Sequence, residues 1–343
     1  MGKFDVIPIE TKTAYTIVSK DVNVCHSLLT TDLYAPCQHR CLYCYVNALG
    51  YVYAAYRKKS KPSVFVNRPE LLRKFFRKHR DLKFPLRIGA LSDVGPPYEV
   101  TTKLLWRVLR YALEYEYPIL IITKVPLHKY NYVGKLLIEM ADVGIIFVSV
   151  TITDIYPEFY RKIEPYAPKV EDRIRFLEWL ENHKIPFSLR ITPLFQGVTD
   201  VKERFIEILD ATPRTHIIVE YLRVRGKKQV MLFKRLGVKP WDSKVDEKWK
   251  YYLAPLEYRI KNYLKLRDMV HSKGRTFAIC GDVRFKISDY RDCCSGPEDF
   301  YGKTMPYKAG KSHDRKIRGL IMNLLPRTPL IKWQDADVNL AEI

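Results

Sequence analysis

Short apolar runs alternate with amphipathic helical patterns along most of this 343-residue chain, and the alternation limits the possible folds more than any other feature. The expected strands cover residues 27–33, 86–91, 119–124, 145–151, 187–192 and 216–223. The expected helices between them cover residues 69–80, 101–116, 132–141, 170–183 and 201–211. Strands and helices in this order form βαβ units around a parallel sheet. Six such units favour a partial or complete (β/α) barrel, in which functional residues gather at the carboxyl ends of the strands.

The pattern changes after about residue 225. Residues 226–237 are basic, a helix is expected over residues 256–273, and residues 276–280 are a candidate for one more strand. We therefore expect an N-terminal segment (1–26), a partial (β/α)6, TIM-like barrel (27–225) and a C-terminal extension (226–343). The extension is basic, aromatic and contains cysteines.

Composition excludes several classes of protein. A hydrophobic content of 47% is too high for a disordered chain. No run approaches the roughly 18 consecutive apolar residues of a membrane span, and the first residues lack the apolar core of a signal peptide. We expect a cytoplasmic protein without a membrane partner.

Charge indicates a polyanionic partner. Lys and Arg number 59 against 38 Asp and Glu, a net charge of +21. Such an excess opposes compaction by self-repulsion, and phosphate contacts supply most non-specific affinity for nucleic acid, so DNA or RNA is the expected partner. A charged thermophile surface is the alternative, although it does not explain the net imbalance.

Two basic tracts concentrate this charge. Residues 57–80 hold ten Lys or Arg and one acid, interleaved with Phe65, Phe75 and Phe76, and residues 303–318 are also basic. Cations beside aromatic rings suit a phosphate backbone with stacked bases. The alternative is a solvated helix face whose phenylalanines point into the core.

Three of the seven cysteines, Cys37, Cys41 and Cys44, form a C-x3-C-x2-C run directly after the first expected strand. Three thiolates on one short loop can converge on one metal centre. Zinc with His39 as a fourth ligand is one alternative. The other is a [4Fe–4S] cluster, in which three protein ligands leave one iron open.

The motif, followed by the aromatic Tyr45 on the first loop of an expected barrel, resembles that of the radical S-adenosylmethionine (SAM) superfamily. The loop at residues 34–46 is similar to that of the spore photoproduct lyase-like, or DNA repair photolyase-like, branch. Segments at 91–99, 122–124, 148–151, 163–168 and 191–197 and Arg173 match that branch in the same order. The resemblance implies a [4Fe–4S] cluster that reductively cleaves SAM to a 5′-deoxyadenosyl radical. It also implies an electron donor such as ferredoxin or flavodoxin.

The resemblance places SAM across the ends of the strands. Tyr45 would contact adenine, Lys124 or Arg190 would pair with the SAM carboxylate, and Arg190 is also suited to a substrate phosphate. Hydroxyls that would hydrogen-bond the methionine or ribose belong to Ser92, Ser149 and Thr151.

One departure from the family concerns cysteine. Spore photoproduct lyase carries a hydrogen-donating cysteine on its second strand, whereas residues 89–93 here contain none. Of the other cysteines, Cys280 follows the late candidate strand, and Cys293 and Cys294 resemble a Cys-Cys-Gly element of some relatives. They are tentative catalytic residues; an auxiliary iron–sulfur cluster and burial as small apolar side chains are the alternatives.

The sequence thus predicts a radical SAM enzyme that abstracts hydrogen from a nucleic acid, for DNA lesion repair or nucleobase modification. The target base must be flipped out or single-stranded. The alternatives are a protein or small-molecule substrate for the same chemistry, or a zinc-stabilised nucleic-acid-binding protein without catalysis.

Overall fold

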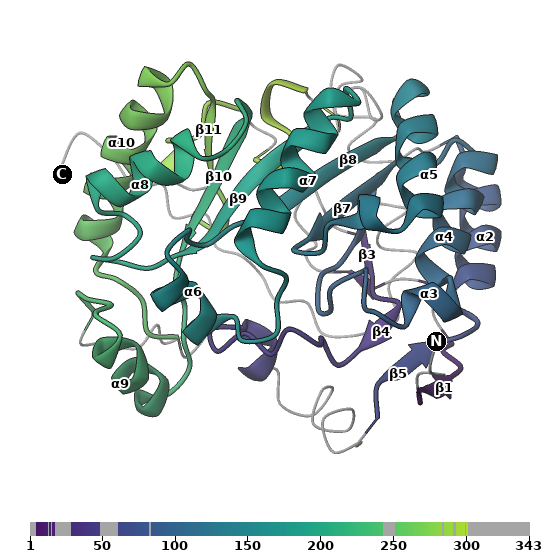
Figure 1. Ribbon diagram of the computed structural model, residues 1–343, viewed down its shortest axis with the longest axis horizontal. Helices are drawn as coiled ribbons and strands as arrows, with labels where there is room; N and C mark the ends of the chain where they lie inside the picture. Colours follow the sequence, from purple (N-terminus) through teal and green to yellow (C-terminus); the bar gives the residue numbers. More distant parts are fainter. Residues whose placement is uncertain are drawn as a thin grey trace.

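A curved, mostly parallel sheet forms the centre of the molecule (Figure 1). The computed structural model describes residues 5–12, 14, 16–17, 29–48, 61–81, 84–242, 251–282, 285–290, 293–298 and 300. Seven parallel strands run in the spatial order β11-β10-β9-β8-β7-β6-β3, with short β2 (Thr16–Ile17) antiparallel at the edge. They are β3 (Leu29–Thr31), β6 (Leu86–Ile88), β7 (Ile119–Thr123), β8 (Ile146–Thr151), β9 (Phe187–Leu194), β10 (His216–Tyr221) and β11 (Phe277–Ile279).

Each expected strand is present, and the sheet is that of a partial TIM-like barrel. The late candidate is β11, which pairs in parallel with β10 and raises the number of parallel strands from six to seven. The sheet therefore continues past residue 225, where we expected the barrel to end. The three-region division of the chain stays a proposal.

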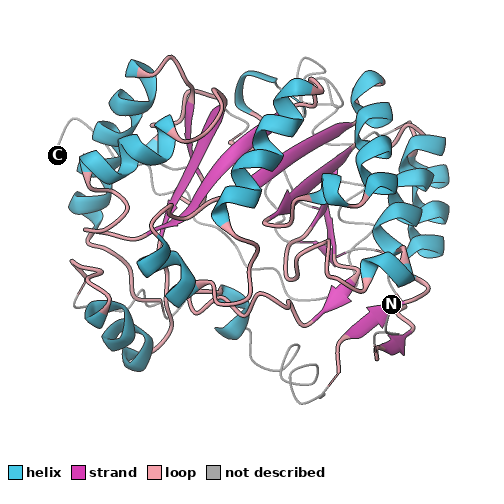
Figure 2. Ribbon diagram, viewed as in Figure 1, coloured by secondary structure: helices cyan, strands magenta, loops and turns pink. Residues whose placement is uncertain are grey.

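Helices cover the outer face of the sheet (Figure 2). Alternate strand residues such as Ile119 and Ile121 pack in the large core under these helices, whereas Leu120 and Ile122 face the opposite side. The longer helices are α2 (Arg68–His79), α4 (Leu104–Glu114), α5 (Asn131–Asp142), α7 (Val170–Asn182), α8 (Lys202–Asp210) and α10 (Leu256–Ser272).

Three local features differ from the expected elements. The helix expected over residues 101–116 is split into α3 (Glu99–Thr102) and α4, because Lys103 adopts a φ of 50°. Two helices were not expected, α6 (Pro157–Ile163) and α9 (Lys227–Arg235). The third feature is a separate small sheet with the strand order β1 (Ile7–Ile9), β5 (Ser63–Phe65) and β4 (Tyr34–Ala35).

The first basic tract does not offer rings for base stacking. Phe65, Phe75 and Phe76 are buried, and Phe76 stacks on Tyr117 inside the core. The prediction of stacked bases at these residues is therefore wrong, because the apolar side of α2 packs inward and Phe65, at the end of Ser63–Phe65, is buried in a separate apolar cluster. Residues 57–60 and the second tract, 303–318, lie outside the described residues.

A C-terminal segment packs against the inner side of the sheet. Cys293, Cys294 and Phe300 share an apolar cluster with Phe147 and Ala278. His216, the first residue of β10, lies with Nε2 3.2 Å from the carbonyl oxygen of Cys293. Among the described residues, no helix combines the length and apolar character needed to cross a membrane.

Candidate active site

The cysteine loop runs from β4 to the short 3-10 helix η1 (Tyr45–Ala48) and is held by two helices. The amide of Leu42 donates to the carbonyl of Ile163 in α6 (2.9 Å), and Gln229 of α9 donates through Nε2 to the carbonyl of Leu42 (3.1 Å). Cys37, Cys41 and Cys44 are reduced thiols. Figure 1 shows α6 and α9 beside this part of the chain. The loop is therefore fixed to the barrel at its centre.

A buried ion network lies beneath the loop. Glu164 accepts hydrogen bonds from Tyr43 and from Thr153 (3.0 Å), and its Oε2 lies 2.6 Å from Nη2 of Arg173. The Nζ of Lys124 lies 3.9 Å from Glu164 Oε1 and 5.5 Å from the centre of the Tyr43 ring. Burial opposes ionisation of Glu164, but Arg173 and Lys124 outweigh it and lower the pKa of Glu164 to about 2. Lys124 is thus held at the loop by a permanent negative charge.

Asp93 joins the ends of two strands to the cysteine loop. Its carboxylate accepts from the amides of Val94 and Lys124 (2.8 Å each) and from the hydroxyl of Thr123 (2.6 Å). His39 Nδ1 lies 3.6 Å from the same carboxylate, beyond hydrogen-bond length. Burial lowers the pKa of His39 to about 4, so this ring is neutral near pH 7. Asp93 therefore ties the end of β7 to the loop after β6.

The loop after β6 is organised by Asp32. Its Oδ1 accepts from the amides of Leu91 and Ser92, at 2.8 Å each. Ser92 is buried there, while Tyr45, which is 45% exposed, donates its hydroxyl to the carbonyl of Ala90 (2.6 Å). The expected adenine contact thus borders the loop that carries Ser92.

The inner wall of the barrel carries the remaining predicted SAM contacts. The hydroxyls of Ser149 and Ser188 lie 2.8 Å apart between β8 and β9, and both residues are fully buried. Thr151 is buried at the end of β8, and its carbonyl accepts from Arg173 (3.1 Å). Arg190 is 7% exposed, and its Nη1 has no hydrogen-bond partner among the described residues. The same guanidinium is hydrogen-bonded to Cys280.

The late cysteines form a second polar cluster beside Arg190. Hydrogen bonding from the Cys293 thiol, with help from Arg190, lowers the pKa of Cys280 well below its ordinary value although burial opposes this. The pKa of Cys293 is raised by its hydrogen bonds to Cys280 and Cys294. Burial and Cys280 raise the pKa of Glu220, on β10, to about 8 although Arg223 opposes this. The structure thus brings the three late cysteines together.

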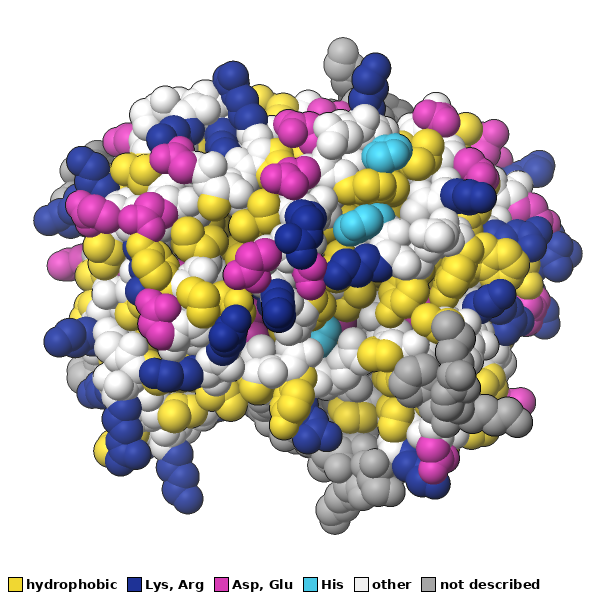
Figure 3. All heavy atoms as spheres, in the orientation of Figure 1, with side chains coloured by type: hydrophobic (Ala, Val, Ile, Leu, Met, Phe, Trp, Pro, Cys, Tyr) yellow, Lys and Arg dark blue, Asp and Glu magenta, His cyan; other side chains and the backbone are white. Residues whose placement is uncertain are grey.

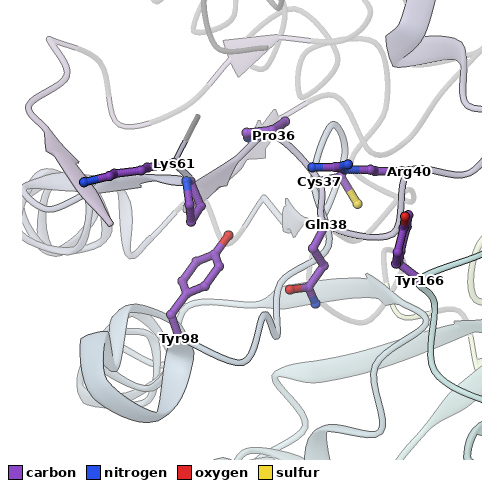
Figure 4. Close-up of a pocket in the computed structure, with 8 residues that line it drawn as sticks. Pro36, Cys37, Gln38, Arg40, Lys61, Tyr98 and Tyr166 are labelled. Carbon is purple, nitrogen blue, oxygen red and sulfur yellow. The ribbon is translucent and has the colours of Figure 1, made fainter. Parts of the chain in front are cut away.

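A pocket of about 310 Å³ opens beside the cysteine loop. Figure 4 shows Lys61 and Tyr98 on one side, Arg40 with Tyr166 on the other, and Gln38 between them. The guanidinium of Arg40 lies 5.6 Å from the centre of the Tyr166 ring, and Tyr166 is 63% exposed. Cys37 also lines the pocket, which therefore combines aromatic, amide and cationic groups next to the metal-binding motif.

The predicted site residues thus fall into two groups. Tyr45, Ser92 and Lys124 border the cysteine loop, whereas Ser149, Thr151 and Arg190 lie on the inner wall of the barrel with the late cysteines. Sequence reasoning missed the roles of Glu164, Tyr43 and Asp93. The one available signal was that Glu164 and Arg173 both belong to the part of the sequence that resembles the family.

Comparison with known proteins decides the family. The model of the Radical SAM superfamily matches residues 33–211, more than half of the chain. This protein belongs to the radical SAM superfamily. The superfamily assignment makes it an enzyme and removes the alternative of a zinc protein without catalysis. An uncharacterized protein of Methanocaldococcus jannaschii is 27% identical over 173 residues, which are 49% of this chain and 61% of that protein.

Solved structures support the same fold for this radical SAM enzyme. Spore photoproduct lyase complexed with a dinucleoside spore photoproduct aligns with a TM-score of 0.55 at 14% identity, over 78% of each chain. A variant of that lyase with bound SAM and the same dinucleoside also aligns with a TM-score of 0.55, at 13% identity. These similarities confirm the partial barrel expected from the sequence.

The donor set of the cysteine loop fits the superfamily's [4Fe–4S] cluster. Burial raises the pKa of Cys37 to about 12 and that of Cys41 to about 11, so both are neutral thiols until a metal displaces the proton. Across the described ranges, no three or more Cys, His, Asp or Glu side chains are close enough to hold a single metal ion. His39, considered above as a zinc ligand, faces Asp93. Three reduced thiols on one loop, each able to bind a different iron, match the cluster.

Proposed function

We propose that this radical SAM enzyme abstracts hydrogen from a nucleic-acid substrate, in DNA lesion repair or in modification of a nucleobase. Cys37, Cys41 and Cys44 would hold the [4Fe–4S] cluster. The bound cluster and SAM would supply the 5′-deoxyadenosyl radical. Side chains of this protein would recognise and position the substrate.

The pocket beside the cysteine loop carries the proposal. A nucleobase presents two aromatic faces and a polar edge, and base–aromatic stacking contributes about 1–3 kcal/mol per base. Tyr166 and Tyr98 offer rings, Gln38 offers an amide that both donates and accepts, and Arg40 and Lys61 offer charges for the phosphates. Because Cys37 lines the same pocket, a base bound there would lie next to the metal-binding loop.

Net charge and the fixed cations support the same substrate. The excess of +21 favours association with a polyanion. Lys124, held by Glu164, would bind the carboxylate of SAM. Arg190, whose Nη1 has no hydrogen-bond partner among the described residues, would bind that carboxylate or a substrate phosphate. We assign Tyr45, Ser92, Ser149 and Thr151 to contacts with SAM as in the sequence prediction.

The late cysteines are proposed to return hydrogen to the substrate radical. In that step a C–H bond forms, an S–H bond of the Cys280–Cys293 pair breaks, and a sulfur radical remains. One electron from a ferredoxin or flavodoxin and one proton from solvent restore the thiol. The pair replaces the second-strand cysteine that this chain lacks. An auxiliary cluster at Cys280, Cys293 and Cys294 is the alternative, and about eight rather than four irons per chain would indicate it.

The test is anaerobic reduction with SAM, with and without single-stranded DNA or RNA, and measurement of 5′-deoxyadenosine. We expect nucleic acid to stimulate its formation, and Tyr166→Ala to abolish the stimulation without changing the basal rate. Tyr166→Phe keeps the ring and should behave as the parent. Stimulation by peptides or metabolites but by no nucleic acid would refute the substrate class.

A further inference from the structure

The helix α9 differs from the other helices in its charge. Among the helices of eight or more residues in the described ranges, α9 is the one without Asp or Glu. Lys227, Lys228, Lys234 and Arg235 on this helix are exposed, as is Lys239 shortly after it. None of these five has an ion-pair partner among the described residues. We call these five side chains the α9 basic face.

Exposed apolar side chains lie among these cations. Met231 is 55% and Leu232 is 37% exposed, and Met231 lies one helical turn from both Lys227 and Arg235. Figure 3 shows Lys and Arg side chains projecting at the lower left, where Figure 1 places α9. Cations next to apolar side chains suit a strand that presents phosphates and the faces of sugars and bases.

The opposite side of α9 is fixed to the cysteine loop. Val230 and Phe233 are buried in one apolar cluster with Cys41 and Tyr43. Gln229 also donates to the carbonyl of Leu42, between the second and third cysteines of the motif. A partner bound to α9 is therefore held in a fixed relation to the cysteines.

We infer that the α9 basic face binds the phosphate backbone of the nucleic-acid substrate and aligns it with the cysteine loop. The inference rests on the proposed function, since it names the surface that holds that substrate. Clustered cations without acids raise the local concentration of a polyanion, and phosphate contacts fix the register of a strand without reading its sequence. Base recognition is left to the pocket lined by Tyr166 and Gln38.

The experiment compares two variants that each remove four charges. In one, Lys227, Lys228, Lys234 and Arg235 become Gln. In the matched control, Lys74, Arg77 and Lys78 of α2 and Lys135 of α5 become Gln. These control residues are also exposed, and they belong to the helices at the opposite side of the molecule in Figure 1.

Binding of a fluorescent single-stranded oligonucleotide is measured from 50 to 300 mM salt. Each lost phosphate contact lowers the slope of log affinity against log salt by about 0.7 for a single strand. We expect the α9 variant to lose about 2–3 in slope and at least tenfold in affinity at 50 mM salt, and the control to stay within twofold. Thermal unfolding should be unchanged in both, because the substituted side chains are exposed.

Equal losses in both variants would overturn the inference, because net charge, or the first basic tract to which the α2 control residues belong, would then contribute as much to binding as α9. So would unchanged binding by the α9 variant, in which case nucleic-acid action would still stand. If the α9 variant binds the oligonucleotide normally but is reduced more slowly by flavodoxin, the α9 basic face binds an acidic protein partner instead of nucleic acid. If the parent enzyme binds no oligonucleotide at 50 mM salt, the proposed nucleic-acid function itself fails.

Discussion

Replacing Glu164 by Gln removes the negative charge that organises the network under the cysteine loop. The pKa of Glu164 is lowered from 4.5 to about 2, and its side chain is fully buried. At about 1.36 kcal/mol per pKa unit, the ionised form stabilises the folded state by about 3 kcal/mol at pH 7. Glu164→Gln should destabilise by at least this amount, since it also leaves the buried Arg173 without its counter-charge.

The pH dependence has a definite sign. A lowered folded-state pKa contributes stability above the unfolded pKa of 4.5, and this contribution is lost as the pH falls through the folded value of about 2. The charge contribution of Glu164 should therefore fall from about 3 kcal/mol at pH 7 to about 1 kcal/mol at pH 3. The difference in free energy of unfolding between the parent and Glu164→Gln should therefore shrink by the same amount between pH 7 and pH 3.

Urea unfolding of the metal-free protein, followed by tryptophan fluorescence at pH 7 and pH 3, measures this. Glu158→Gln, at an exposed position of the same helix α6, is the control and should change stability by less than about 0.5 kcal/mol. Adding Arg173→Met to Glu164→Gln should recover part of the loss, because the fully buried charge of Arg173 is then removed together with its partner and only the partly exposed Lys124 loses its counter-charge. A loss below about 1 kcal/mol, or one that is equal at pH 7 and pH 3, would refute the reasoning.

Other consequences follow from the inner wall and from Asp93. Ser149→Ala leaves the buried Ser188 hydroxyl without its partner and should cost about 1–3 kcal/mol. Ser149→Ala combined with Ser188→Ala should cost less than the two single losses summed, and urea unfolding of all three variants checks this. Phe147→Ala should cost about 3–5 kcal/mol by the same assay, since this buried ring packs against Phe300. Asp93→Ala removes the two hydrogen bonds, from Thr123 and Lys124, that join the end of β7 to the loop after β6. It should lower 5′-deoxyadenosine formation at least tenfold; an unchanged rate would exclude that role.

The repeating pattern of apolar residues was sufficient to predict the barrel. Each expected strand forms because apolar residues occupy both sides of the sheet; on β7, Ile119 and Ile121 face the helices, whereas Leu120 faces the inner side. The ends of the helices were less predictable. The helix expected from 101 to 116 breaks at Lys103, because this residue adopts a left-handed conformation that the pattern of apolar residues does not indicate. Short elements such as α6 were missed because seven residues span too few turns to show a period.

The cysteine motif was predictable because its ligands are neighbours in sequence. The groups that support it are not, since Glu164 reaches Tyr43 across 121 positions and Gln229 reaches Leu42 across 187. Such contacts depend on how the helices pack and leave no local signal. The prediction that bases stack on the phenylalanines of the first basic tract failed for the same reason, because the sequence alone does not show which side of α2 faces inward.

The most direct measurement is iron content together with SAM cleavage in single variants of the cysteine loop. Anaerobically purified parent protein should carry about four irons per chain and form 5′-deoxyadenosine on reduction. Cys37→Ala, Cys41→Ala and Cys44→Ala should each lose most of the iron and all of the cleavage, while Cys280→Ala keeps both. Loop variants that retain full iron and unchanged cleavage would contradict a cluster held by these three cysteines.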